Sequence, residues 1–210
     1  IVLNGGYVIV QIVVAYMANS ASLLADAGHN LGDVLALVMA WVAARLVTKA
    51  ATKSMTFGYK KSSILAALMN GVILMFSCGV IAAEAIHKLI DPSAIAAIDV
   101  MVVAGIGILI NGGSALLFMR GQDDLNIKAA FLHLAYDALV SLGVVIAAAL
   151  IYFTHWLWID PVVGLLIAII ILKGTWSLMR DSLHLVLGGV PREVSFDAIY
   201  TYLKSIKGVT

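Results

Sequence analysis

Six long runs of apolar residues dominate this chain of 210 residues. They lie at residues 1–19, 23–47, 63–90, 98–119, 127–153 and 158–179. A bilayer core about 30 Å thick is crossed by about 20 helical residues, which is close to the length of the shortest runs. Only 12% of the residues are charged, whereas a soluble domain has about 25%. The sequence therefore predicts an all-α membrane protein with six transmembrane helices.

The positively charged residues predict how these helices are oriented. Lys88 is the one such residue in the connections on one side, and Lys173 lies within the last run. The other side holds eleven: Arg45, Lys49, Lys53, Lys60, Lys61, Arg120, Lys128, Arg180, Arg192, Lys204 and Lys207. Because cytoplasmic loops carry the excess of Lys and Arg, both termini are predicted to be cytoplasmic. Trp156 and Trp158 then belong to the outer interfacial belt.

The character of the chain changes after residue 190, so we predict two units. Residues 1–190 form the transmembrane domain, and residues 191–210 begin a cytoplasmic C-terminal domain that is truncated here. Apolar residues recur at helical spacing in this second segment, at Phe196, Ile199, Tyr200, Leu203 and Ile206. They predict an amphipathic helix whose apolar face needs a partner. A helix lying on the membrane surface is the alternative.

Two stretches place a histidine and an aspartate four residues apart inside apolar runs. They are His29-Asn-Leu-Gly-Asp33 and His133-Leu-Ala-Tyr-Asp137. Residues at this spacing share one face of a helix. Ionisable groups in hydrocarbon cost several kcal/mol unless they are paired, solvated or bound to a metal, so they are candidates for function.

The two pairs are predicted to meet. The second and fifth helices are antiparallel, and each pair lies at a similar depth in the bilayer interior. Two histidines and two aspartates supply four ligands, the number that a tetrahedral zinc ion takes. Imidazole with carboxylate suits zinc and neighbouring transition metals better than magnesium or calcium. We therefore expect His29, Asp33, His133 and Asp137 to bind Zn²⁺.

This ligand set argues against an enzyme. Four protein ligands leave no open coordination position for hydrolytic chemistry, and the chain has no His-Glu-x-x-His motif. The lone Cys78 excludes an internal disulfide and a Cys-rich metal site. A metal competes with protons for imidazole and carboxylate, so a site that alternates between faces exchanges metal for protons. The histidines are the predicted proton carriers because they titrate nearest physiological pH.

Other polar residues in the apolar runs have more ordinary interpretations. Asp26 either guides cations toward the pairs from outside or simply lies near a helix end. Asn30 and Tyr136 are either supporting neighbours of the pairs or incidental. Gly28 and Gly32 favour close approach of another helix. Interhelical hydrogen bonds are expected for Asn70, Asn111 and Ser141. We expect interfacial positions for Glu84 and His87, and no special role for His155 and His184.

Two other classes of protein also place histidines inside a membrane. A haem protein could use His29 and His133 as axial ligands, but both aspartates would be left buried without a purpose. A cation channel is the second alternative. A closed four-ligand site binds too tightly for fast conduction, which needs weak or multiple sites.

Several motifs resemble the cation diffusion facilitator family, the group that includes the zinc transporters. The resemblance extends along essentially the whole chain, with the motifs in the family's order. The matching segments are Asn19–Asp33, Phe57-Gly-Tyr-Lys-Lys, Ile64–Asn70, Ala130–Asp137, Asp160-Pro161 and Asp181–Pro191.

This resemblance implies a proton-coupled zinc exporter that acts as a homodimer, with six membrane spans and a ferredoxin-like cytoplasmic domain. The family's transport site maps onto His29, Asp33, His133 and Asp137, a ligand set typical of zinc transporters that sometimes also handle cadmium or cobalt. The Arg120–Asn126 connection lacks the histidine-rich insertion of many eukaryotic members. That difference favours a bacterial cytoplasmic membrane. The expected partners are zinc, protons, lipid and a second copy of the chain, and no nucleic acid.

Overall fold

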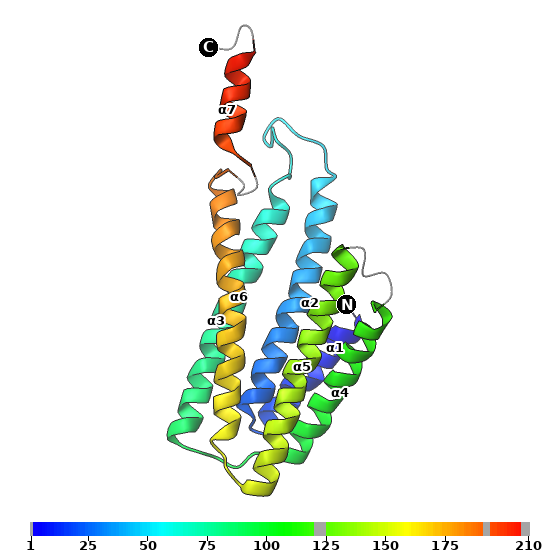
Figure 1. The fold of residues 1–210 in the computed structure, drawn as a ribbon, viewed down its shortest axis with the longest axis vertical. Coiled ribbons are helices and arrows are strands. Elements are labelled where there is room, and N and C mark those ends of the chain that lie inside the picture. Colours follow the sequence, from blue (N-terminus) through cyan, green and yellow to red (C-terminus); the bar gives the residue numbers. More distant parts are fainter. Residues whose placement is uncertain (1, 120–124, 191–193, 207–210) are drawn as a thin grey trace.

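The computed structural model describes residues 2–119, 125–190 and 194–206, and these residues form seven helices and no strand (Figure 1). Six of the helices build one bundle, and a short seventh helix follows it. The helices are α1 (Val2–Met17), α2 (Ala21–Val47), α3 (Ser62–Ile90), α4 (Ala97–Leu117), α5 (Leu125–Thr154), α6 (Ile159–Val186) and α7 (Phe196–Ser205). The predicted all-helical membrane bundle is confirmed.

The helices follow the predicted runs closely. Five of them, α2 to α6, are long and apolar enough to cross a membrane. The first run forms α1, a helix of 16 residues, which at 1.5 Å per residue is about 24 Å long and shorter than a full crossing. At the other end, α6 continues to Val186, past the predicted end at residue 179. The apolar run stops near Arg180, but the helix extends beyond it.

Helix α2 is the central element of the bundle. It contacts α1, α3, α5 and α6, while α3 packs closely along α6 and α4 along α5. In Figure 1, α3 and α6 lie side by side, and α1, α4 and α5 gather on the other side of α2. The core includes Leu23, Val100 and Val144, which are fully buried. Both His-Asp pairs are carried by helices that meet at this core.

The outer end of α2 is held by a carboxylate from α6. Asp160 Oδ1 accepts hydrogen bonds from Ser20 Oγ at 2.6 Å and from Ser22 Oγ at 2.5 Å, and its Oδ2 accepts one from the Ala21 amide at 2.5 Å. Ser20 is also the N-cap of α2, where its hydroxyl accepts from the Leu23 amide. An acidic side chain at a helix N-terminus is favourable because backbone N–H groups there lack partners. This cap fixes where α2 begins.

The amphipathic segment after the bundle forms α7. Ser195 caps it by accepting a hydrogen bond from the Ala198 amide. No residue of α7 is buried, and the helix lies beyond the end of α6 in Figure 1. The predicted amphipathic helix therefore exists, whereas residues 191–193 and 207–210 of the same predicted segment lie outside the described residues. At the opposite end of the bundle, Trp156 and Trp158 are exposed and stacked, as expected for an interfacial belt.

Candidate metal centre

The two His-Asp pairs face each other with their order reversed. Helices α2 and α5 run antiparallel, so the histidine of each pair lies level with the aspartate of the other. His29 Nε2 is 3.1 Å from Asp137 Oδ1, and His133 Nε2 is 3.7 Å from Asp33 Oδ1. A repeated His-x-x-x-Asp pattern on antiparallel helices therefore produces two crossed pairs, one helical turn apart.

The four side chains converge on one point. Along each helix, His29 Nε2 is 4.0 Å from Asp33 Oδ2 and His133 Nε2 is 3.7 Å from Asp137 Oδ2. Each carboxylate thus turns one oxygen toward each histidine. Ligand atoms at about 2.0–2.2 Å from a tetrahedral zinc ion lie about 3.3 Å from one another. The four His–Asp separations approach that value, whereas the rings of His29 and His133 are 6.4 Å apart between centroids, so the His133 side chain would have to move toward the other three for all four groups to bind one ion.

Three of the four form the tightest part of this cluster. Ligand atoms of His29, Asp33 and Asp137 all lie within 4.8 Å of one another. His133 is the loosest member, and its side chain is 52% exposed, against 5% for Asp137. Among the ion pairs of the described residues, the carboxylates of Asp33 and Asp137 have only histidine partners. A divalent cation would neutralise Asp33 and Asp137, which pair with no lysine or arginine among the described residues.

A buried polar network closes the outer side of the site. Gln11 Nε2 donates to Asp26 Oδ2 at 2.6 Å, and Ser141 Oγ donates to the same oxygen at 3.0 Å. Asn30 Nδ2 donates to Gln11 Oε1 at 3.0 Å. Asp26 lies one turn beyond His29 on α2, and Ser141 one turn beyond Asp137 on α5. The network therefore joins α1, α2 and α5 directly behind the two ligands nearest the outer face.

Cavities reach the site from two sides. One of about 90 Å³ is lined by polar side chains of α1, α2, α4 and α5, including Tyr7, Asn111 and His133. Another of about 330 Å³ lies between α2, α3, α5 and α6 and is lined by His29 and Asp33. Asp33 lines both cavities. The pairs are accordingly approachable, while Gln11, Asp26 and Ser141 behind them are fully buried.

The structure corrects the interpretation of Asp26. We expected it to guide cations from outside or to lie at a helix end without a special role. Asp26 is fully buried, and its Oδ2 is held by Gln11 and Ser141. The guiding role is contradicted, because the carboxylate is buried away from the outer surface with its Oδ2 bonded to donors from α1 and α5. Asp26 does lie near the outer end of α2, which begins at Ala21, but it takes part in a hydrogen-bond network there.

The other polar neighbours divide into contact-making and incidental residues. Ser141 makes the predicted interhelical hydrogen bond, and Asn30 is a buried member of the network. Tyr136 is 67% exposed and is incidental. Asn70 and Asn111 behave differently from prediction, since Asn70 Oδ1 and Asn111 Nδ2 have no hydrogen-bond partner among the described residues.

The two glycines beside the first pair do permit close helix approach. A Cβ at Gly28 would lie 2.7 Å from Ile81 Cδ1, and one at Gly32 would overlap Leu74. The groove of α2 is thus filled by large side chains of α3. Near the outer end of α3, Glu84 is partly exposed and His87 exposed, in line with interfacial positions. His184 approaches the Val190 carbonyl at 3.1 Å, and His155 is exposed.

Sequence reasoning assigned no structural contact to three side chains: Gln11, Lys88 and Asp160. Gln11 and Asp160 are buried polar residues whose importance depends on partners from distant helices. Lys88 is only 7% exposed and pairs with Glu84 at 3.5 Å. Gln11 and Asp160 are single polar residues within or beside an apolar run, and Lys88 follows His87 near the end of one. A polar residue that interrupts such a run is the available signal, but it does not identify the partner.

The fold and the site define an integral, polytopic α-helical membrane protein with His-Asp pairs inside the bundle. Residues 1–187 match the family of the cation efflux transmembrane domain. The cadmium, cobalt and zinc/H(+)-K(+) antiporter of Bacillus subtilis (strain 168) is 35% identical over 207 residues, which is 97% of this chain and 67% of that protein.

Two further relatives agree. The metal cation efflux system protein CzcD of Cupriavidus metallidurans is 36% identical over 208 residues, or 99% of this chain and 66% of that protein. Zinc transporter ZitB of Escherichia coli (strain K12) is 35% identical over 196 residues, or 92% and 62%. The chain spans about two thirds of the length of these relatives.

The chain therefore belongs to the cation efflux family, which confirms the resemblance to cation diffusion facilitators. The bacterial relatives and the apolar helices together support an integral protein of the inner membrane.

Proposed function

We propose that this chain is the membrane part of a secondary active transporter that exports Zn²⁺ from the cytoplasm in exchange for protons. His29, Asp33, His133 and Asp137 are the proposed ligands of the transported ion. One observation carries the proposal: four zinc-type ligands from two antiparallel helices converge within the bundle at separations of 3.1 to 4.0 Å.

Charge balance explains why such a site exchanges ions. Two carboxylates inside a membrane are costly when nothing neutralises them. A divalent cation neutralises both, and protons on the same histidine and aspartate groups do so after the metal has left. Because metal binding requires neutral imidazole and ionised carboxylate, binding of one species displaces the other. Coupling of zinc export to proton entry follows from the ligands themselves.

The proposed substrate range is zinc first, with cadmium and cobalt as further candidates. Two nitrogen and two oxygen donors at tetrahedral spacing favour zinc over magnesium or calcium. The names of the relatives include zinc transport for ZitB and cadmium, cobalt and zinc antiport for the Bacillus subtilis protein, which supports this range.

The rival classes have weaker support. Both histidine Nε2 atoms approach carboxylate oxygens, which is an arrangement for a cation and not for a haem. A channel is disfavoured because the relatives are named as transporters, antiporters or efflux proteins. We infer that zinc passes through as cargo and undergoes no enzymatic reaction.

Two parts of the proposal concern the whole protein. We propose that residues 1–190 form the transmembrane domain and that residues 191–210 begin a cytoplasmic domain, since α7 leaves its apolar face uncovered. A homodimer is proposed from the family resemblance alone. Mass measurement of the purified protein in detergent tests it directly.

Zinc uptake into proteoliposomes tests the proposed site. Asp137→Ala removes a ligand that is almost fully buried, and we expect it to abolish uptake and to lower bound zinc in equilibrium dialysis. Asp99→Asn, an exposed aspartate in the first turn of α4, is the matched control and should transport normally. Zinc transport that survives Asp137→Ala contradicts the site, and wild-type uptake that ignores an imposed pH gradient contradicts proton exchange.

A further inference from the structure

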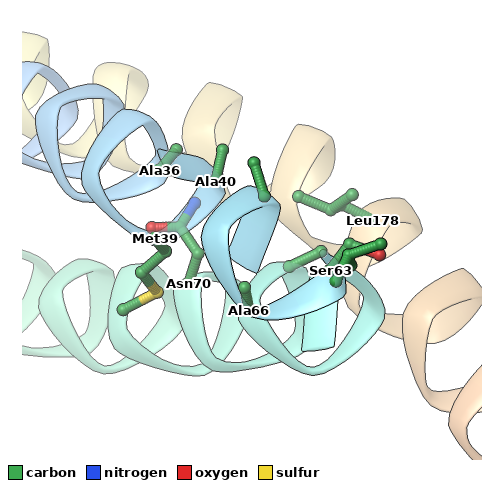
Figure 2. Close-up of a pocket in the computed structure, with 10 residues that line it drawn as sticks. Ala36, Met39, Ala40, Ser63, Ala66, Asn70 and Leu178 are labelled. Carbon is green, nitrogen blue, oxygen red and sulfur yellow. The ribbon is translucent and has the colours of Figure 1, made fainter. Parts of the chain in front are cut away.

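A cleft leads from the predicted cytoplasmic ends of α2 and α3 toward the candidate metal centre. The cytoplasmic end of the cleft is a cavity of about 470 Å³, which begins at Val47 and Ser63 (Figure 2). Its inner part is the cavity of about 330 Å³ that His29 and Asp33 line. The two cavities share three lining residues, Ala36, Asn70 and Leu178. They therefore meet at one point, beside Asn70.

The contact between Gly32 of α2 and Leu74 of α3 indicates how deep Asn70 lies in the bilayer. Gly32 of α2 packs against Leu74 of α3, and these two helices are antiparallel. Asn70 lies one turn before Leu74, so it is level with Ala36, one turn to the cytoplasmic side of the ligands. An ion that enters along the cleft passes Asn70 before it reaches Asp33.

The Asn70 amide is buried without the hydrogen bonding that buried amides normally have. Its residue is 5% exposed, and its Oδ1 has no hydrogen-bond partner among the described residues. Figure 2 shows the amide extending from α3 toward α2, beside Ala36. Unsatisfied buried carbonyl oxygens are rare in folded proteins, so this one calls for a specific explanation.

The rest of the cleft is poorly suited to hold a cation. Most of its lining between Val47 and the ligands is aliphatic, with Ala36, Ala40 and Ala44 forming a stripe on α2. Ser63 at the mouth is a polar residue, and Thr175 of α6 faces the inner cavity. A neutral amide oxygen binds a cation weakly, which is what passage requires, because a contact on a transport route must also release its ion.

We propose that Asn70 Oδ1 is a transit contact for the divalent cation on its way from the cytoplasm to the four-ligand site. This inference rests on the proposed function, since it requires that the chain transports a cation. Asn70 Oδ1 replaces one water of the cation's hydration shell at the inner end of the cleft. His29 and Asp33 then replace further waters. Asn70 is thus a positioning residue for the cation and not a ligand of the final site.

Transport kinetics separate this role from a structural one. Asn70→Leu keeps the volume but removes the oxygen, and we expect the KM for zinc uptake to rise about tenfold, the effect of one weak polar contact. The equilibrium affinity for zinc and the thermal midpoint in detergent should stay near the wild-type values. Met69→Leu changes the neighbouring, 46% exposed residue of α3 and serves as the control.

The measured KM, zinc affinity and thermal stability decide whether Asn70 is a transit contact. A tenfold rise in KM with unchanged affinity supports the transit contact. A KM within twofold of wild type overturns it, as does an equal loss of equilibrium affinity and thermal stability. If the wild-type protein transports no zinc, the proposed function itself has failed, and that result is seen before any Asn70 variant is measured.

A labelling experiment covers the case in which Asn70→Leu does not fold. Cys78 is the lone cysteine, so Asn70→Cys in a Cys78→Ser background presents a single thiol. We expect a membrane-impermeant maleimide to label this thiol from the cytoplasmic side and not from the outer side, because position 70 lies on the proposed route from the cytoplasm. Labelling from the outer side, or no labelling from either side, overturns the proposal.

Discussion

The two halves of α2 differ sharply in how they are packed. Of the residues of this helix that are buried, all but Ala43 lie between Ala21 and Gly32. The outer half is enclosed by α6 through Asp160 and by α1 and α5 through the Gln11–Asp26–Ser141 network. The cytoplasmic half borders the cleft instead. His29 and Asp33 thus lie where the tightly packed outer half of α2, called the fixed half below, meets its loosely packed cytoplasmic half.

This difference indicates which side of the site is open. Exposure of the four candidate ligands falls from 52% at His133 and 29% at Asp33 to 23% at His29 and 5% at Asp137. The more exposed pair is the one nearer the predicted cytoplasmic side. Asp26, behind the other pair, is fully buried. The four candidate ligands are therefore more exposed toward the predicted cytoplasmic side than toward the outer side, where the buried network lies.

The largest effect on the fixed half is expected from Asp160→Ala. It removes the acceptor of hydrogen bonds from Ser20, Ala21 and Ser22 and leaves those donors buried. Removing one partner of a buried charged network costs about 3 kcal/mol. We expect a lower thermal midpoint in detergent, measured by the fluorescence of the tryptophans. Asp99→Asn should leave the midpoint unchanged, and an equal shift in both variants would show that the cap has no special importance.

A matched pair of substitutions tests the contrast within α2 itself. Ala25 is fully buried in the outer half, whereas Ala40 lines the open cleft of the cytoplasmic half. Introducing a large side chain into a packed core costs about 1–3 kcal/mol, so Ala25→Leu should lower thermal stability clearly. Ala40→Leu has free space and should change it by less than about 0.5 kcal/mol. Equal destabilisation by the two variants would contradict the difference between the halves.

The sequence predicts the parts of this architecture that depend on local pattern. Helix positions follow from the length of apolar runs, and the crossed His-Asp pairs follow from a four-residue spacing on antiparallel helices. The continuation of α6 past residue 179 was not predicted, because Arg180 and Asp181 end the apolar pattern without ending the helix. Helical hydrogen bonds continue where side chains leave the hydrocarbon, so composition marks the membrane boundary and not the helix end.

Contacts between distant helices could not be predicted in the same way. The hydrogen-bond partners of Asp26 come from α1 and α5. Ser20, a donor to Asp160, lies 140 residues before it in the chain. These pairings depend on how each helix is rotated about its axis, which a single amphipathic pattern does not specify when the helix is apolar on all sides. The unpaired Asn70 oxygen is equally a property of the assembled bundle.

The smallest expected effect concerns selectivity within the site, at the ligand that touches the fixed half. His29 lies 3.1 Å from Asp137 and next to Asn30 of the buried network, so its geometry is more constrained than that of His133. His29→Asp replaces a nitrogen donor with a shorter, more flexible oxygen donor, which relaxes the preference for small tetrahedral ions. We expect the zinc-to-cadmium uptake ratio to fall about fivefold, equivalent to about 1 kcal/mol.

His133→Asp is the informative comparison for that prediction. The side chain of His133 is exposed and less constrained, so the same substitution there should change the ratio less. Competition between the two metals for uptake into proteoliposomes measures both ratios under one condition, with Tyr136→Phe as a control at an exposed neighbour. If His29→Asp leaves the ratio unchanged, nitrogen donors do not set selectivity. If both substitutions change it equally, the rigid outer half contributes nothing to selectivity, and the four ligands act as one flexible cluster.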